Sequence, residues 1–493
     1  MRASRPASGS TAAVLAVALF AGVTLGTEGA SARSTSPVDG RFADGGRISI
    51  NWGFNGTVAA RPDGSLMFAG GWDQGAGSRW QLRGFTRAGH RDRRFGDNGL
   101  VNLKFHHPVA DRINNDVAED VLSDGRGGMV VVGQVDQTRK QDIENAPDVG
   151  YGLPGEGWRP EIRAVRITRD GRIDRRFGKG GKLVLDRWVH PTGEGYSSGF
   201  NRFVDGFFKL RRGFAVVLAD PKLGWASRTI RVITFDKVGR NRRSIQIALP
   251  PSTANGPHVG GIAISKSGAV YVRMYTTILM ADAIRTTTLR VLRFTRAGAP
   301  DPSYVSPVVD VSAGSLDPVA WESIRGLELD GSGFVLDRRE RILFGYTRID
   351  ANGLPKLAVG RLNRTGRWDP AFGDDGTAMI ARPVNSASSP AGIAVSRSGV
   401  ITVAGAVDQA PFNGRFDFGS VGPAGIVARF TDSGRLLKSW SDQGIFLLAK
   451  AGYRACVWGG AAPFQAGPRT LLLGCQKSGH TEDLRSTIIG LKR

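Results

Sequence analysis

Residues 167–181 read Ile-Thr-Arg-Asp-Gly-Arg-Ile-Asp-Arg-Arg-Phe-Gly-Lys-Gly-Gly. The same pattern returns at 85–99, as Phe-Thr-Arg-Ala-Gly-His-Arg-Asp-Arg-Arg-Phe-Gly-Asp-Asn-Gly, and at 362–376, as Leu-Asn-Arg-Thr-Gly-Arg-Trp-Asp-Pro-Ala-Phe-Gly-Asp-Asp-Gly. Weaker copies occupy 235–242, 294–304 and 430–444. A unit that recurs along a whole chain indicates a repeat architecture. The first turn glycines of the copies are Gly89, Gly171, Gly239, Gly298, Gly366 and Gly434.

A second unit alternates with the first. It consists of two apolar stretches joined by a turn that contains Asp-Gly or Ser-Gly, as in 58–70, 121–133, 262–272 and 393–405. This pattern is typical of a β-hairpin. Two further strands are expected in each repeat, one before the repeat glycine (288–294) and one after Phe-Gly (100–105). Four-stranded antiparallel units repeated around an axis form a β-propeller, whereas the absence of a sustained 3.6-residue pattern argues against a helical solenoid.

The two ends of the repeat region complement each other. The last repeat supplies only three strands, of which the third is expected at 486–491. Near the N-terminus, 39–46 reads Asp-Gly-Arg-Phe-Ala-Asp-Gly-Gly, the turn that precedes a fourth strand. We therefore expect Ile48 and its neighbours to complete the last blade, so that no sheet edge stays open at the seam. The prediction is an all-β, seven-bladed β-propeller; six or eight blades would require misassigning a degenerate copy, most readily the one at 235–247.

The repeated unit resembles the delta-60 repeat family, in which an arginine-bearing strand and a glycine turn precede Asp-x-x-Phe-Gly-x-x-Gly. The match extends over about 36–493 and is strongest in the three copies quoted first. The resemblance implies a propeller in exported or surface proteins of bacteria. It implies no catalytic residues, so none is carried over.

The N-terminus has the pattern of an export signal. Arg2 and Arg5 precede an apolar run at 12–25, and Ala30-Ser31-Ala32 forms a small-residue cleavage site. The run is shorter than the ~20 residues of a spanning helix. We predict a signal peptide at 1–32, a single propeller domain at 33–493 and a secreted location, with no transmembrane anchor; a permanent N-terminal anchor is the alternative.

The composition fits a soluble protein with many turns. Hydrophobic residues make up 41% and charged residues 22% of the chain, and 68 of its 493 residues are glycine, about twice the usual share of ~7%. The only cysteines, Cys456 and Cys475, are predicted to form a disulfide in the closing blade, because exported proteins with an even cysteine count favour pairing. Two buried free thiols are the alternative. A zinc site would need further ligands.

In such a blade, the loops between strands two and three and between blades share one face, which we call the loop face. These loops vary most in length, and variable loops on a rigid scaffold commonly bind ligands. They contain aromatic residues suited to stacking on sugars or anchoring a protein, although the same residues could instead pack down to stabilise their own loops. Three aspartates that follow second strands could bind a polar ligand or simply cap their own turns. The predicted ligand-binding residues are Trp72, Asp73, Asp136, Tyr151, Trp158, Trp188, Tyr196, Trp225, Trp321, Asp408 and Phe416.

The opposite face carries the short turns, and we call it the turn face. Its sequence is rich in arginine, in a chain of net charge +22, and arginine suits bidentate contacts with phosphate or carboxylate. We predict attraction to an anionic cell-envelope polymer or surface, with nucleic acid bound only non-specifically; a solvated surface enriched in arginine by genome composition is the alternative. The predicted anion-binding residues are Arg87, Arg93, Arg94, Arg169, Arg175, Arg176, Lys237, Arg242, Arg243, Arg296 and Arg364.

Two catalytic motifs are missing from the sequence, namely His-Glu-x-x-His and a phosphate-binding loop. His190, Glu194, Glu322 and Asp136 are candidate acid–base groups, but their spacing does not pair them. Two functions therefore remain: a secreted binding or scaffold propeller that needs no metal or cofactor, and an extracellular propeller enzyme of lyase, glycosidase or dehydrogenase type with its site at the axial mouth of the loop face. We favour the first.

Overall fold

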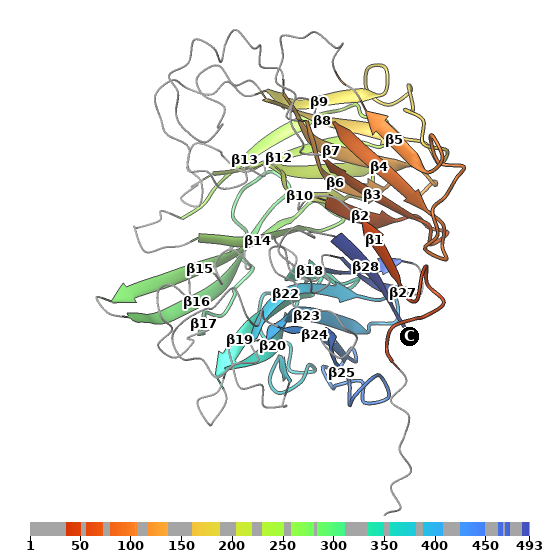
Figure 1. Cartoon of the computed structure of the whole chain (residues 1–493). Coiled ribbons are helices and arrows are strands. Elements are labelled where there is room, and N and C mark those ends of the chain that lie inside the picture. Colours follow the sequence, from red (N-terminus) through yellow and green to blue (C-terminus); the bar gives the residue numbers. More distant parts are fainter. Residues whose placement is uncertain are drawn as a thin grey trace, which may run out of the picture. The chain divides into compact units, whose positions relative to one another are not determined.

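The structure is a computed structural model. It describes residues 36–50, 56–71, 79–103, 105, 116–136, 160–187, 204–218, 229–250, 258–280, 283–310, 333–349, 355–380, 388–407, 424–448, 462–466, 469–473 and 486–492. Within these ranges the chain forms seven four-stranded antiparallel sheets, the blades of a seven-bladed β-propeller, which confirms the predicted fold class (Figure 1).

The strands follow one another in each blade from the first to the fourth, and the blades follow the chain. Blade 1 contains β2 (Gly56–Ala60), β3 (Leu66–Gly71), β4 (Trp80–Phe85) and β5 (Leu100–Leu103). Blade 2 contains β6 (Val117–Ser123), β7 (Met129–Asp136), β8 (Pro160–Ile167) and β9 (Lys182–Arg187). Blade 3 contains β10 (Val204–Lys209), β11 (Gly213–Leu218), β12 (Thr229–Asp236) and β13 (Arg243–Ala248).

Blades 4 to 6 repeat the same order, with shorter fourth strands. Blade 4 contains β14 (His258–Ile264), β15 (Val270–Met280), β16 (Ala283–Phe294) and β17 (Val309–Asp310). Blade 5 contains β18 (Phe334–Leu336), β19 (Ile342–Ile349), β20 (Pro355–Leu362) and β21 (Thr377–Met379). Blade 6 contains β22 (Ser388–Val395), β23 (Ile401–Val407), β24 (Ala424–Phe430) and β25 (Ile445–Leu447). The hairpin of β15 and β16 is longer than the predicted strands at 262–272 and 288–294.

Blade 7 closes the ring with strands from both ends of the chain. It contains β26 (Ala462–Ala466), β27 (Arg469–Leu473), β28 (Ser486–Leu491) and β1 (Arg47–Ile50). β1 lies antiparallel beside β28, with Ile48 opposite Ile488 (Figure 1). First strands of neighbouring blades contact one another around the whole ring, including β26 with β2. The predicted closure by the N-terminal strand is confirmed.

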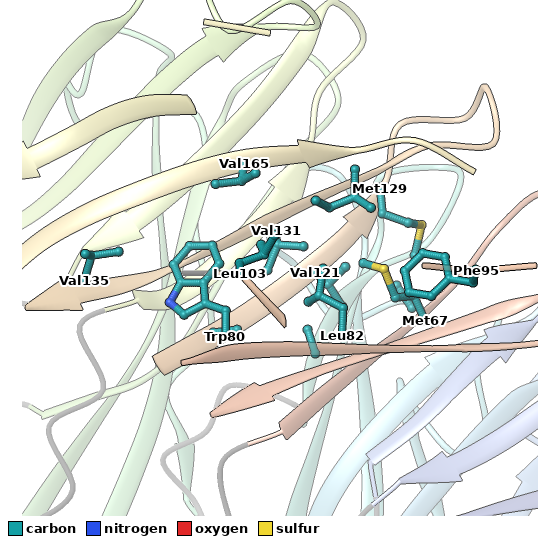
Figure 2. Close-up of a cluster of buried hydrophobic side chains, with 14 residues drawn as sticks. Met67, Trp80, Leu82, Phe95, Leu103, Val121, Met129, Val131, Val135 and Val165 are labelled. Atoms are coloured by element: carbon teal, nitrogen blue, oxygen red, sulfur yellow. The ribbon is translucent and has the colours of Figure 1, made fainter. Parts of the chain in front are cut away.

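The hydrophobic core lies between neighbouring blades. Alternate side chains of each strand face the next blade, so that the apolar faces of two sheets pack together. Between blades 1 and 2, Trp80 is fully buried and its indole nitrogen donates to the carbonyl oxygen of Gln134 at 2.8 Å. Each fully buried large apolar side chain contributes about 1.5–3 kcal/mol. Figure 2 shows this cluster, whose labelled members are Met67, Trp80, Leu82, Phe95, Leu103, Val121, Met129, Val131, Val135 and Val165.

The repeated Asp-x-x-Phe segment forms a tight turn that aims the aromatic ring into this core. In blade 2, the amide of Phe177 donates to the carbonyl of Asp174 at 3.0 Å, and the Asp174 carboxylate accepts the amide of Arg176 at 3.2 Å. Phe177 is fully buried. The aspartate is therefore present because its short carboxylate caps the turn. The equivalent aromatic residues in other blades are Phe42, Phe95, Tyr304, Phe372 and Trp440.

In five of the seven blades, the residue that follows the aromatic ties the blade to the next. The amide of Gly96 in blade 1 donates to Asp170 of blade 2 at 2.8 Å, and the acceptor directly precedes the repeat glycine Gly171. We call this bond, with the glycine turn that receives it, the inter-blade latch. The latches described are Ala43 to Ala88, Gly96 to Asp170, Gly178 to Val238, Val305 to Thr365 and Gly373 to Ser433.

Blade 3 departs from this pattern. Its turn after Gly239 is shorter and lacks the Asp-x-x-Phe segment, as its weak sequence copy indicates. The glycine turn of blade 4 packs directly on β13 instead, where a Cβ on Gly298 would lie 3.0 Å from the carbonyl oxygen of Gln246. The seam between these two blades therefore depends on apolar packing, with Ile247 and Leu249 against the strands of blade 4.

We predict that Gly171→Ala destabilises the fold more than Gly180→Ala. Both glycines have positive φ, +87° and +61°, so each alanine costs about 1 kcal/mol in backbone strain. A Cβ on Gly171 would lie 2.5 Å from the amide nitrogen of Gly96, whereas one on Gly180 meets nothing within 4 Å. Urea denaturation should therefore give a further loss of about 1 kcal/mol or more for Gly171→Ala, because its latch must break. Equal losses would contradict the latch.

Candidate functional site: the arginine-rich turn face

In blades 1 to 6 the turn face is built from two turns, one after the first strand and one after the third. In blade 2 these are 124–128, between β6 and β7, and 168–181, between β8 and β9. Both lie at the same end of the sheet because consecutive strands are antiparallel. The arginines of this face divide into a set that is buried or half-buried near the repeat aromatics, which we call the buried set, and an exposed set at the tips of the turns.

The buried set comes from one position of the third strand. The guanidinium of Arg361 lies 4.4 Å from the ring centre of Phe372, and that of Arg429 lies 4.5 Å from Trp440. Such cation–π contacts are worth about 2 kcal/mol when they are desolvated. Arg361 also pairs with Asp369 at 2.8 Å and is 1% exposed. The corresponding arginines of blades 2 and 4, Arg166 and Arg293, pair with Asp174 at 3.6 Å and with Asp301 at 3.0 Å.

Where glycine replaces this arginine, another arginine takes its place. Blades 1 and 7 have Gly84 and Gly490, and a Cβ on either would lie within 3 Å of the repeat phenylalanine. In blade 1 the guanidinium of Arg61, from the first turn, lies over Phe95 at 5.4 Å. In blade 7, Arg469 lies over Phe42 at 5.9 Å. Blades 1 and 7 therefore keep a guanidinium over the repeat phenylalanine, although the arginine comes from a different position in the sequence.

The buried arginines also reach the next blade. Arg293 donates to the carbonyl of Arg364 at 3.1 Å, and Arg469 donates to that of Arg87 at 2.7 Å. In both pairs the acceptor lies two residues before the repeat glycine of the following blade. The buried set thus reinforces the latch. The other donor–acceptor pairs of this kind are Arg61 to Arg169, Arg166 to Lys237 and Arg361 to Asp432, while Arg429 donates to Lys492 at the end of blade 7.

Arg429 differs from the other third-strand arginines in having no carboxylate partner among the described residues. Leu437 occupies the position of the repeat aspartate. Burial lowers the pKa of Arg429 to about 10. Burial likewise lowers the pKa of Arg361, and the neighbouring charge of Arg341 adds to this effect. By contrast, the hydrogen bond from Arg176, opposed by partial burial, lowers the pKa of Asp174 and keeps it ionised.

The predicted anion-binding residues all belong to the exposed set. Arg169 pairs with Asp63 of blade 1 at 3.0 Å, and Arg176 pairs with Asp174 at 3.1 Å. Arg364 donates to the carbonyl of Arg339 at 2.6 Å. The remaining members form no ion pair within the described ranges. These are Arg87, Arg93, Arg94, Arg175, Lys237, Arg242, Arg243 and Arg296.

A shallow recess opens on this face between blades 2 and 3. Its volume is about 480 Å³, and its charged lining consists of Arg163, Lys179, Lys182 and Arg240, with no carboxylate. Burial, together with the charge of Arg163, lowers the pKa of Lys182. Arg163 is held by Glu161 at 2.6 Å. The list of predicted anion-binding residues includes none of these four cations, because cations from β8, β9 and the next blade meet here only in the folded ring.

The loop-face predictions fall outside the described residues. This holds for Trp72, Asp73, Tyr151, Trp158, Trp188, Tyr196, Trp225, Trp321, Asp408 and Phe416, for His190, Glu194 and Glu322, and for Cys456 and Cys475. Asp136 ends β7, but its side chain is not described. In the ranges that are described, no three His, Cys, Asp or Glu side chains are placed to share a metal ion. The same ranges contain no apolar helix of membrane-spanning length.

Comparison with known proteins yields structural likeness only. No protein-family model and no curated protein matches the sequence. Sqt1 from Chaetomium thermophilum is 10% identical, with 90% of this chain and 97% of that chain covered at a TM-score of 0.39. An α-L-arabinofuranosidase from Fusarium graminearum is 7% identical, with 78% and 97% covered at a TM-score of 0.40. These likenesses assign no partner or substrate to this chain.

We predict that Arg361→Met destabilises the fold more than Arg429→Met. Removing Arg361 leaves the nearly buried Asp369 with only its longer contact to Arg341, at 3.4 Å, and breaking a buried ion pair costs up to about 3 kcal/mol. Removing Arg429 leaves no unpaired carboxylate in the described structure, and burying methionine avoids the desolvation of a charge. Denaturation midpoints in urea, measured with two optical probes, test the order. The prediction is wrong if Arg429→Met is the more damaging substitution.

Proposed function

We propose that this protein is an exported, non-catalytic binding module whose turn face docks on an anionic polymer or surface of the cell envelope. The observation that carries the proposal is the exposed set of arginines without ion-pair partners, most of which lie in blades 1 to 3. Clustered positive charge raises the local concentration of polyanions and speeds their association. Arginine binds phosphate and carboxylate oxygens through two parallel hydrogen bonds.

Two further parts of the proposal rest on the sequence. The signal-like segment at 1–32 and the resemblance to delta-60 repeats support export. The aromatic residues of the variable loops support a glycan or a protein as the ligand of the loop face. Nothing in the described ranges favours the enzymatic alternative over this function.

We expect the purified protein to co-sediment with isolated cell envelope at low ionic strength and to be released by sodium chloride. Contacts between exposed charges are screened once the Debye length falls to about 3 Å in 1 M salt. The measurement is the bound fraction across a salt series, with envelope stripped of its anionic polymers as the control. Failure to bind at low salt would refute docking by the turn face, and binding that is unchanged at 1 M salt would place the contact elsewhere.

A further inference from the structure

Blades 1 to 3 share a feature that the other blades lack. Each presents two consecutive exposed arginines after its repeat glycine, namely Arg93-Arg94, Arg175-Arg176 and Arg242-Arg243. The corresponding stretches of blades 4, 5 and 6 read Pro302-Ser303, Pro370-Ala371 and Lys438-Ser439. Because blades 1, 2 and 3 are consecutive in the ring, the three arginine pairs lie on neighbouring blades.

The recess joins the second pair to the third. Gly178 and Lys179 of its lining follow Arg176 by two and three residues, and Gly239 and Arg240 precede Arg242. The recess therefore lies between the two pairs and adds Lys179, Lys182 and Arg240 to the same stretch of surface. Its lining includes no carboxylate that would compete for these cations.

The turn face of blades 1 to 3 presents positive charge, but its large aromatic rings are buried and cannot stack on the bases of a nucleic acid. The repeat aromatics Phe95 and Phe177 of blades 1 and 2 are buried, and so is Phe235 at the end of β12 in blade 3. The large apolar side chains exposed within the described ranges are Val238, Val305 and Val308. Proteins that bind single-stranded nucleic acid stack bases on exposed aromatic rings. Successive pairs are also separated by a whole blade, which suits a polymer whose charges are spaced along a flexible chain.

We propose that the three arginine pairs and the recess form one track for a linear polyol-phosphate polymer, with phosphodiester groups held successively by blades 1, 2 and 3. This inference rests on the proposed function and names the ligand class of the same face. The guanidinium groups hold phosphate oxygens by bidentate hydrogen bonds, and the recess receives a phosphate between blades 2 and 3. Binding at this track requires a polymer long enough to span neighbouring blades.

The test compares two variants that lose equal charge from the same face. The track variant replaces Arg93, Arg94, Arg175, Arg176, Arg242 and Arg243 with Gln. The control variant replaces six exposed cations of blades 4 to 6 with Gln, namely Lys266, Arg296, Arg367, Arg397, Arg435 and Lys438. A third variant, Lys179→Gln with Arg240→Gln, removes two cations of the recess. Every side chain that is replaced in these variants is exposed, so we expect each variant to fold. The half-buried Lys182 of the recess is left unchanged.

The probe is poly(glycerol phosphate), used as a long chain and as a short oligomer of about two repeats. We expect the track variant to bind the long chain at least about tenfold more weakly and to lose about one unit of salt dependence per phosphate contact removed, while the control variant changes less than about threefold. The recess variant should fall between them. The short oligomer should bind weakly to all proteins, because it cannot span two blades.

Each contrary result has a distinct meaning. Equal loss in the track and control variants would overturn the track but leave the proposed function standing, since net charge alone would then account for binding. Tighter binding of double-stranded DNA or of a sulfated glycan, with the same dependence on the six arginines, would overturn the polyol-phosphate class. No binding of any anionic polymer by the unaltered protein would overturn both proposals.

Discussion

Five of the seven blades are held to the next where the residue after a buried aromatic donates its amide to a glycine turn. This bond requires several features of the repeat at once. The aspartate caps the turn that buries the aromatic, and the glycine gives the positive φ and the free space that the neighbouring amide needs. In blade 2, for example, the amide of Gly178 reaches Val238 only because Phe177 anchors the turn in the core. The motif is therefore a connector between blades.

Arginine strengthens the same junction from inside. A guanidinium lies over the aromatic ring, forms an ion pair where an aspartate is present and donates to the following blade, so one side chain contacts three elements. A planar group with several donors can do this, whereas the ammonium of lysine cannot. The replacement of a third-strand arginine by Arg61 from the first turn of blade 1 shows that the cation matters more than the strand that provides it.

The separation of the arginines into a buried structural set and an exposed set determines which positive charges are available for binding. In blades 4 to 6, arginines such as Arg341 are bound by Asp337 and Asp432, and the stretches that correspond to the arginine pairs read Pro-Ser, Pro-Ala and Lys-Ser. In blades 1 to 3 the tips carry paired arginines that the described carboxylates leave largely unneutralised. Consecutive exposed arginines after the repeat glycine are thus confined to one part of the ring within the described ranges. A partner that recognises the positions of the charges, and not only the net charge, would distinguish blades 1 to 3 from blades 4 to 6.

The sequence by itself determined the fold class, the number of blades and the closing role of the segment around Ile48, because these follow from the period of the repeat and from local turn chemistry. It also indicated which turns carry arginine. Only the tertiary structure decided which arginines are structural. Arg166 and Arg169 are three residues apart, yet the first is directed to Asp124, Asp174 and the next blade, while the second extends into solvent. Their partners lie in other turns and other blades, and the recess between blades 2 and 3 likewise forms only when the ring brings distant segments together.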